Sequence, residues 1–299
     1  MKKLQIVLLV VFLMGCSSGP NAFPVVTPSI EQTPSLAPAQ TVILPTQTLT
    51  PTPTLTPTPT ATAIGGGGGK IAFTSERDGY SEIYVINSDG SELNALTNSI
   101  TPKYDPAWSP GGEKIAFGSN TNDSGHLYVM NADGSNPIRL ISTQGVEYHE
   151  PVWSPDSKKI AFSASRGVGC CLSYHNIYVI DADGSNLVSF SARSEEDFGP
   201  VWSPDSQMLA FSSGSRNGWN WEVYVVNADG SNLINFTHKN ELDADPSWSS
   251  DGKRITFSSS RNGTSDIYVA NADGTNLVTL TNNNNGSDGG PVWSPDGKK

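Results

Sequence analysis

The sequence has 299 residues and carries 18 Lys and Arg against 29 Asp and Glu, a formal net charge of −11 at pH 7. Only Lys2, Lys3 and Glu31 of these charged residues precede residue 70, so the acidity belongs to the later part of the chain. An acidic domain is a poor ligand for nucleic acid or anionic lipid, so we expect no nucleic acid partner. Metal cations or basic partners fit this charge better.

Residues 1–16, MKKLQIVLLVVFLMGC, have the layout of an export signal. Two lysines precede an apolar run that ends at Met14 and is too short to span a bilayer comfortably. The ending Leu13-Met14-Gly15-Cys16 resembles the lipobox of bacterial lipoproteins, which implies that Cys16 becomes the lipidated first residue after cleavage. We therefore expect a lipid-anchored, extracytoplasmic protein. An ordinary secretory peptide and an uncleaved anchor are the alternatives.

Residues 17–69 are predicted to form a linker. From Pro20 to Ala63 the chain is rich in Thr and Pro, as in LTPTPTLTPTPTATA, and lacks the apolar density that a core requires. In polyproline geometry, at about 3.1 Å per residue, such a segment reaches roughly 130 Å. Gly65 to Gly69 then supply a flexible joint before a domain at 70–299.

From Lys70 onward the sequence repeats with a period in the forties, which points to a propeller or a solenoid. Each repeat has a P-x-W-S phrase, a K-I-A-F run, an I-Y-V run and a weaker fourth run. The tryptophans of the phrase are Trp108, Trp153, Trp202, Trp248 and Trp293. The runs are short, β-branched and aromatic, and SPDG or NADGSN turns separate them. We predict an all-β fold, a β-propeller with four-stranded blades.

The two ends of the repeat region complement each other. The first repeat begins at K-I-A-F (Lys70 to Phe73) without a Trp strand, and residues Pro291 to Lys299 supply a Trp strand without the rest. We predict that this C-terminal strand pairs with the N-terminal blade and closes a ring of five blades, because closure removes exposed sheet edges. The alternative is a truncated six-bladed propeller.

The repeat P-x-W-S-P-D-G-K-x-I-A-F-x-S-x-R-x-G, followed by I-Y-V-x-N-A-D-G-x-N, resembles the TolB-type, WD-repeat-like propeller family over residues 70–299. The best-known member of that family is a six-bladed periplasmic protein that binds protein partners, and related propellers occur beside serine peptidase domains. Neither the additional N-terminal domain of that protein nor a hydrolase domain is recognisable in this sequence. We therefore expect the fold to transfer and the functions not to transfer directly.

Antiparallel order places the SPDG and NADGSN turns on one face of the predicted disc and the variable loops on the other, where binding sites usually lie. At least one acid precedes every P-x-W phrase on the variable face. These acids are Asp105, Glu150, Asp197, Asp243 with Asp245, and Asp288. They either surround the channel mouth as a site for a cation or basic ligand, or form structural salt bridges. Their repetition, and that of Arg77, Arg166, Arg216 and Arg261, favours the salt bridges.

Two loops on the variable face break the repeat. The loop SRNGWNWE adds Trp219 and Trp221, which either bind a sugar or protein partner or cover a neighbouring blade. The loop SRGVGCCLSYHN contains adjacent cysteines, Cys170 and Cys171, which in an exported protein pair with each other, stay reduced or cross-link to another chain. Further candidates for the binding face are Tyr148, His149, Tyr174 and His175. The spacing matches no metal motif, so we expect neither a metal nor a cofactor.

These features favour a membrane-tethered, monomeric binding or scaffold module that holds a protein or a glycan in the cell envelope. The alternative is a glycoside-processing or other hydrolytic propeller enzyme that uses the acids at the channel mouth. Those acids occupy near-equivalent repeat positions without one unusual pair, and the sequence contains neither G-x-S-x-G nor H-E-x-x-H. We predict a protein that is not an enzyme and has no catalytic residues.

Overall fold

The computed structural model describes residues 69–121, 124–168, 172–190, 196–214, 220–238, 241–282 and 286–298, and of these the side chains of 167–168 and 172–174 are not described. The expected signal, with Cys16, and nearly all of the linker lie outside the described residues. So do Cys170, Cys171, Trp219 and the side chain of Tyr174. Every regular element in the described ranges is a β-strand, and these ranges hold no helix that could cross a membrane.

The described strands group into five consecutive antiparallel units, which we call blades; the third and fourth belong to one eight-stranded sheet. Blade one contains β1 (Lys70–Ser75), β2 (Glu82–Asn87) and β3 (Asn94–Ala95). Blade two contains β4 (Lys103–Trp108), β5 (Lys114–Thr121), β6 (Ser124–Asn131) and β7 (Ile138–Gln144). Blade three contains β8 (Val146–Trp153), β9 (Lys159–Val168), β10 (Leu172–Asp181) and β11 (Val188–Phe190). Blade four contains β12 (Glu196–Trp202), β13 (Met208–Gly214), β14 (Trp221–Asn227) and β15 (Ile234–Asn235). Blade five contains β16 (Asp243–Trp248), β17 (Arg254–Ser259), β18 (Asp266–Asn271) and β19 (Val278–Thr279).

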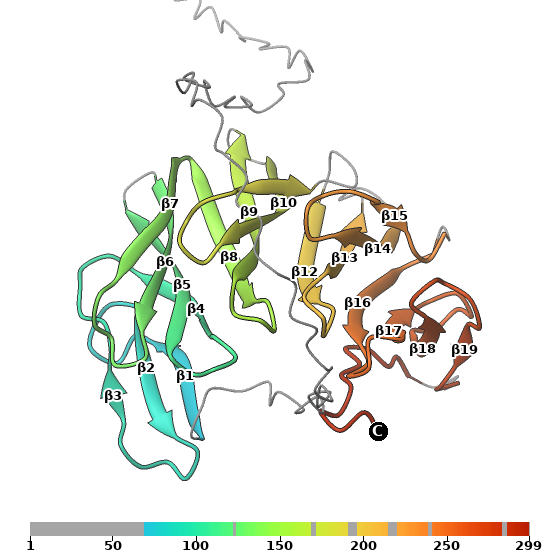
Figure 1. Ribbon diagram of the computed structural model, residues 1–299, viewed down its shortest axis with the longest axis horizontal. Helices are drawn as coiled ribbons and strands as arrows, with labels where there is room; N and C mark the ends of the chain where they lie inside the picture. Colours follow the sequence, from blue (N-terminus) through green and yellow to red (C-terminus); the bar gives the residue numbers. More distant parts are fainter. Residues whose placement is uncertain are drawn as a thin grey trace, which may run out of the picture. The chain divides into compact units, whose positions relative to one another are not determined.

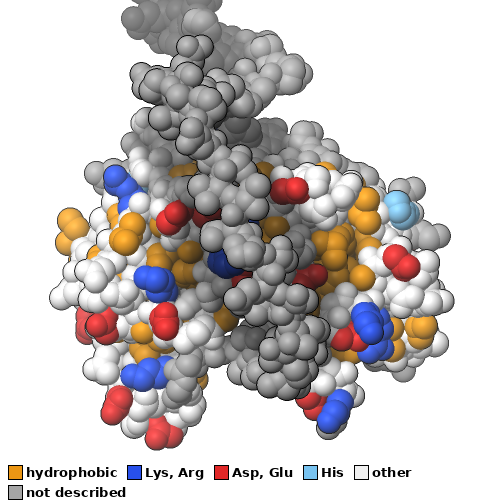
Figure 2. Space-filling model, in the orientation of Figure 1, with side chains coloured by type: hydrophobic (Ala, Val, Ile, Leu, Met, Phe, Trp, Pro, Cys, Tyr) orange, Lys and Arg blue, Asp and Glu red, His pale blue; other side chains and the backbone are white. Residues whose placement is uncertain are grey.

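The blades follow one another in chain order along an arc that runs from β1 to β19 (Figure 1). Within each blade, successive strands pair antiparallel, as the repeat predicts. A single parallel bridge between His175 of β10 and Glu196 of β12 joins blades three and four into one sheet. Figure 2, in the same orientation, shows positive and negative side chains interspersed over the coloured part of the visible surface.

The predicted turns lie together at one end of the blades, which we call the turn face. In the NADG turn of blade four, Asp229 Oδ1 accepts hydrogen bonds from Ser231 N at 2.9 Å and from Ser231 Oγ at 2.6 Å. Gly230 has a φ of 87°, which glycine adopts without steric cost. The stretch DADGS, Asp181 to Ser185 in blade three, has the same geometry, because Ser185 N and Oγ both donate to Asp183 Oδ1. It is therefore a hairpin turn. The opposite end, where β4, β8, β12 and β16 begin, is the loop face.

The core lies between blades, and its four interfaces have one design. Each blade offers a small side chain from its second strand and two larger apolar side chains from its third and fourth strands. The next blade packs a Phe, a Tyr and a Trp against them. Between blades four and five the first group is Ala210, Val223 and Phe236, and the second group is Phe257, Tyr268 and Trp248. Equivalent residues meet in the other three interfaces, so the strands read as apolar on both faces because both faces are buried.

The structure does not contain the predicted closure of the ring. Strand β1 pairs with β2 alone among the described residues, and blade one stays three-stranded. Residues 286–298, here called the C-terminal segment, form no strand. They lie against blade five instead, where the Trp293 ring sits 4.5 Å from the guanidinium carbon of Arg254. Ser294 Oγ donates to Asp296 Oδ1 at 2.7 Å, as the corresponding serines do in the SPD turns of blades three and four.

Candidate functional site

The acids before the P-x-W phrases occupy two different structural positions. Asp105, Glu150 and Asp245 stand directly before the proline, at a β-bulge in the first strand of their blade, with φ values of 51°, 51° and 55°. A bulge adds one residue to the strand and turns that residue away from the sheet, so these carboxylates reach the loop face. Asp197 and Asp243 stand three residues before the proline and are fully buried.

The acids at the bulges connect neighbouring blades. Glu150 N donates to Asp105 Oδ2 at 3.2 Å, and Gly199 N donates to Glu150 Oε2 at 3.4 Å. Each of these carboxylates therefore accepts the backbone N–H at the equivalent bulge of the next blade. In blade five Ser258 Oγ donates to Asp245 Oδ2 at 2.9 Å. The bulge acids thus have a structural role, since two of them join neighbouring blades.

One of the buried acids, Asp243, forms a structural salt bridge of the kind predicted from the repeated acids and arginines. Asp243 Oδ1 lies 3.1 Å from Arg261 Nη2, and their side chains are 0% and 12% exposed. Arg261 also stacks over Phe257 and Tyr268, with its guanidinium carbon 5.3 and 4.6 Å from the ring centroids. The pair is part of the packing of blade five. Asp288, the equivalent acid of the C-terminal segment, is partly exposed.

Tyr148 does not belong to the binding face on which the sequence placed it. Its side chain is 2% exposed, its ring meets Phe162 edge-on, and its hydroxyl donates to Thr143 Oγ1 at 2.8 Å. Side chains alternate along a strand, so Tyr148 points into the core while its neighbours Glu147 and His149 point the other way. In the described part of the chain no three His, Cys, Asp or Glu side chains come together in a way that could hold a metal ion.

Five rings form a continuous row across blades two to four, near the loop face. In order they are Tyr104, His149, His175, Phe198 and Trp221, and all five are partly exposed. Successive ring centroids are 5.4, 6.3, 4.6 and 5.4 Å apart. We call this set the ring row. Aromatic rings that stay partly exposed in an ordered row are well suited to bind the apolar face of a partner.

The first strand and the third strand of the blades supply the ring row. Tyr104, His149 and Phe198 stand two residues before the proline, beside the bulge, so the bulge fixes the direction of their side chains. His175 and Trp221 stand three residues before the Tyr of the third strand. The sequence pointed to His149, His175 and Trp221 but missed Tyr104 and Phe198. A comparison of the residues two places before each proline would have revealed these two.

Polar groups surround the ring row at the Tyr104 end. His149 lies between two carboxylates, with Nδ1 3.6 Å from Asp105 Oδ2 and Nε2 3.4 Å from Glu147 Oε2. Asn120 joins the group, because its amide donates to Glu147 Oε1 at 3.0 Å and its oxygen accepts from the Tyr104 hydroxyl at 2.6 Å. The Glu147 and Asp105 side chains are 55% and 41% exposed, so this group can exchange hydrogen bonds with a ligand.

The contact between His149 and Asp105 changes the pKa of both side chains. Interaction with Asp105 raises the pKa of His149, against the effect of burial, and Glu147 adds in the same direction. The His149 imidazole and the N–H of Glu150 hold the pKa of Asp105 below its ordinary value. Burial is the main cause that raises the pKa of Tyr104, which therefore stays a neutral hydrogen-bond donor. This end of the ring row thus places the His149 imidazole between the carboxyl groups of Asp105 and Glu147, and the contact with Asp105 favours its protonated form.

Comparison with known proteins identifies the fold. A family model described as the TolB beta propeller domain matches residues 56–171 and 173–299. The structure is similar to TolB from Acinetobacter baumannii, with 22% identity and a TM-score of 0.55 over 78% of this chain and 57% of that protein. It is also similar to an oligogalacturonate lyase from Vibrio parahaemolyticus, with 16% identity and a TM-score of 0.59 over 77% of this chain and 66% of that one.

A third similar structure is a puromycin-hydrolyzing peptidase from Mycobacterium tuberculosis, at 16% identity and a TM-score of 0.59, covering 73% of this chain and 38% of that protein. At these identities the likeness concerns the fold, and no curated protein sequence matches this chain. The chain spans little more than half the length of the Acinetobacter TolB. The family model, in contrast, covers most of the 299 residues. The chain therefore belongs to the TolB beta propeller domain family.

Proposed function

We propose that this protein is a binding module of the cell envelope that holds a protein or glycan partner against the loop face of its propeller. The ring row carries the proposal, because it offers five partly exposed rings in a line across three blades. Such rings provide large contact area at a low entropic cost, and interfaces are enriched in them. Acyl chains attached to Cys16 would anchor the protein to a membrane, and the linker 17–69 would tether the propeller outside it.

Charge limits the class of partner. Asp105, Glu147 and Glu150 lie beside the ring row at its Tyr104 end, and the whole chain has a net charge of −11. Repulsion disfavours anionic polymers, so the partner class is neutral sugars, amino sugars or basic protein segments. Membership of the TolB beta propeller domain family supports a place outside the cytoplasm.

The hydrolytic alternative is less well supported. A glycosidase needs one carboxylic acid and one free carboxylate at a fixed separation. Here Asp105 and Glu150 already accept backbone N–H groups from the next blade, and Asp243 is paired with Arg261. The enzymes among the similar structures share only the fold with this chain.

Binding of the purified protein to an array of neutral, amino and uronic acid oligosaccharides and to basic peptides tests the proposal. Trp221→Ala combined with Phe198→Ala should lower affinity at least tenfold, because stacked rings contribute most of the contact. The matched control is Leu233→Ala, which removes a side chain 37% exposed near the turn face and should bind normally. Equal binding by both variants would refute the ring row as the site. Turnover of any bound sugar that Glu150→Gln abolishes, with the fold retained, would establish the enzyme instead.

A further inference from the structure

Blade two carries basic side chains at two positions where other blades carry acids. Three residues before the proline, Lys103 stands where blades four and five have Asp197 and Asp243. Two residues before the Tyr of the third strand, blades one, four and five have an acid, and blade two has His126. Lys103 and His126 are 9% and 5% exposed. Blade two therefore buries two basic groups at positions that are acidic elsewhere in the repeat.

The imidazole of His126 is satisfied at one nitrogen only. Its Nε2 lies 2.7 Å from Thr121 Oγ1, and its ring meets Tyr128 edge-on. The buried Nδ1 has no hydrogen-bond partner in the described part of the chain. A neutral imidazole with its proton on Nε2 leaves only an acceptor unsatisfied. A protonated imidazole carries an N–H on both nitrogens, so it would bury a charged donor without an acceptor.

The surroundings of His126 disfavour its protonation. Burial lowers the pKa of His126, and the positive charges of Arg139 from β7 and Lys103 from β4 lower it further. Strand β5 places the uncharged Ser119 opposite His126, and β8 packs on the other face of β6. The carboxylate of this interface is Glu82 from β2 of blade one, which is 4% exposed.

Glu82 is engaged by groups other than His126. Thr97 Oγ1 and Ser99 N donate hydrogen bonds to its carboxylate. Burial lowers the pKa of Lys103, and the charge of Glu82 opposes this effect, so the carboxylate acts on the ammonium of Lys103. A proton on His126 would therefore add a positive charge that no carboxylate in the described interface is placed to compensate.

Lys103 is also a main connection between blades one and two. Its backbone N donates to Ser81 O at 2.7 Å, and Ser81 Oγ donates to Lys103 O at 2.9 Å. Its ammonium donates to Ser99 Oγ, Thr101 O and Thr101 Oγ1, each at 2.6 Å, in the loop that leaves blade one. A positive charge on His126 thus acts on the residue that joins the two blades.

We propose that His126 is a pH-sensitive switch in the interface between blades one and two. Protonation of its imidazole places a further positive charge beside Lys103 and Arg139, leaves a buried charged N–H without an acceptor, and weakens the contacts of Lys103 with blade one. Blade one then opens from blade two, whereas the neutral imidazole keeps the interface closed. This inference concerns the contact between two blades and does not depend on the proposed function.

The sign of the effect follows from the pKa of His126 in the two states. In the open interface the imidazole has its ordinary pKa of 6.5, and in the closed interface its pKa is lower. The interface therefore has its full stability above pH 6.5 and loses stability as the pH falls, because the open state binds the proton more tightly. At pH 5.5 the open state should gain up to about tenfold over the closed state. Protonation of His149 has the opposite sign, so the measurement must be local.

Hydrogen exchange of the full chain at pH 7.5 and pH 5.5, corrected for the intrinsic effect of pH on exchange, tests the proposal. The amides of β2 should lose up to about tenfold in protection at pH 5.5, while those of β18, the equivalent strand of blade five, should not. His126→Gln keeps an amide near Thr121 but takes up no proton, so the loss should disappear. The matched control is His238→Gln, at an exposed histidine of blade four, which should respond as the wild type does. The same loss in His126→Gln as in the wild type would overturn the proposal.

A surface variant separates the switch from a defect in folding. Arg139 is exposed, so Arg139→Gln should fold normally, and removal of its charge should raise the pKa of His126 and reduce the loss of protection at β2. An NMR titration of the four histidines, with the His126 signal identified by its absence in His126→Gln, measures that pKa directly. A wild-type pKa of 6.5 or higher, or an acid response that Arg139→Gln leaves unchanged, would refute the switch.

Discussion

The indole N–H of Trp153 donates to the backbone carbonyl of Ala107 at 3.1 Å, across the interface between blades two and three. Trp202 makes the same bond to Val152, also at 3.1 Å, between blades three and four. In each case the acceptor is the residue before the Trp of the preceding blade. The buried indole nitrogens of Trp108 and Trp248 have no hydrogen-bond partner among the described residues, although a Trp strand, β12, precedes the blade of Trp248.

Trp153, which makes the hydrogen bond, and Trp108, which does not, can therefore be compared to measure what the bond contributes to stability. Trp153→Phe removes a hydrogen bond and leaves the Ala107 carbonyl without its donor, so we expect a loss of about 1–3 kcal/mol beyond the loss of packing. Trp108→Phe loses packing alone. Urea unfolding of both variants measures the difference, and equal losses would mean that the bond to Ala107 contributes nothing.

The buried ion pair of blade five should be sensitive to the loss of its cation. Arg261→Met leaves the carboxylate of Asp243 buried without a counter-ion, and we expect a loss of about 3–5 kcal/mol in the free energy of unfolding. The control is Lys158→Met, which breaks a pair with Asp156 at 3.8 Å whose side chains are 80% and 40% exposed. That exposed pair should contribute less than about 1 kcal/mol. Similar losses in both variants would contradict the structural role of Arg261.

Stability should depend on pH through His149. Its pKa is raised from 6.5 in the folded state, so the folded protein binds this proton more tightly than the unfolded chain does. The stabilisation is fully present below the unfolded pKa and is lost as the pH rises through the folded pKa. The pKa of Asp105 is lowered from 3.8, so its share is lost as the pH falls through the folded value. The advantage of the wild type over His149→Gln should therefore peak between these two values.

Thermal unfolding from pH 3 to pH 9 measures this window. Asp105→Asn is the informative control, because it keeps an acceptor for the Glu150 N–H but removes the charge that faces His149. The advantage of His149 over Gln should shrink in that background. A constant difference across the whole pH range would show that His149 contributes through packing alone.

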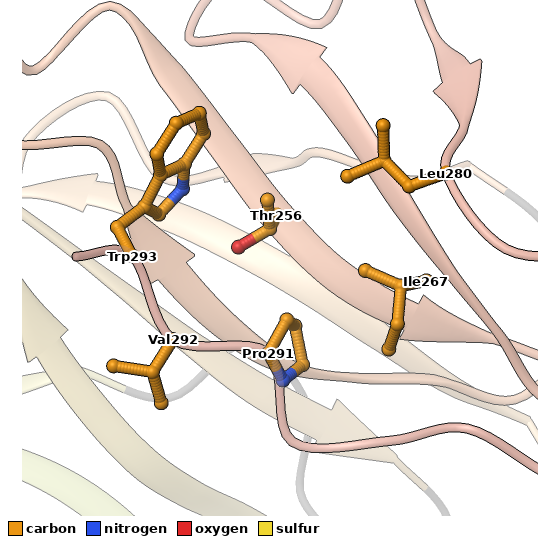
Figure 3. A pocket seen from close by; sticks show the side chains of 6 residues that line it. All are labelled: Thr256, Ile267, Leu280, Pro291, Val292 and Trp293. Atoms are coloured by element: carbon orange, nitrogen blue, oxygen red, sulfur yellow. The ribbon is translucent and has the colours of Figure 1, made fainter. Parts of the chain in front are cut away.

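Removal of residues 291–299, which include most of the C-terminal segment, should destabilise the propeller. A chain of residues 65–290 loses the contact of Trp293 with Arg254 and uncovers Thr256 and Ile267 (Figure 3). Burial of one large apolar side chain contributes about 2 kcal/mol, which corresponds to a fall of roughly 4–8 °C in melting temperature for a domain of this size. Thermal unfolding beside residues 65–299 measures the difference. Unchanged melting would show that the segment is not part of the folded unit.

The sequence was sufficient for the strands and turns because their signals are local. Asp-Gly turns and β-branched runs predict the hairpins of blades two to five, and the structure confirms four strands in each of these blades. The pairing of Asp243 with Arg261 could also be predicted, since an acid and an arginine recur at these positions of the repeat. The closure of the ring, in contrast, depends on a contact between distant ends, and β1 pairs only with β2 in the described chain.

The site was harder to predict because bulges shift the alternation of side chains. Glu150 and Asp197 look equivalent in the sequence, since both shortly precede a P-x-W phrase. The bulge places the residue next to the proline on the surface and the residue two places earlier in the core, so one is exposed and the other is buried. Tyr148 was assigned to the wrong face for the same reason. Only the register of each strand reveals which side chains meet in the ring row.

The shared design of the four interblade interfaces has a consequence for the history of such a chain. Because every blade offers the same surface to its successor, a duplicated blade would find a compatible neighbour on each side at once. Loss of a blade would likewise bring two matching surfaces together. A gene that encodes this repeat can therefore change its number of blades by recombination without the invention of any new contact.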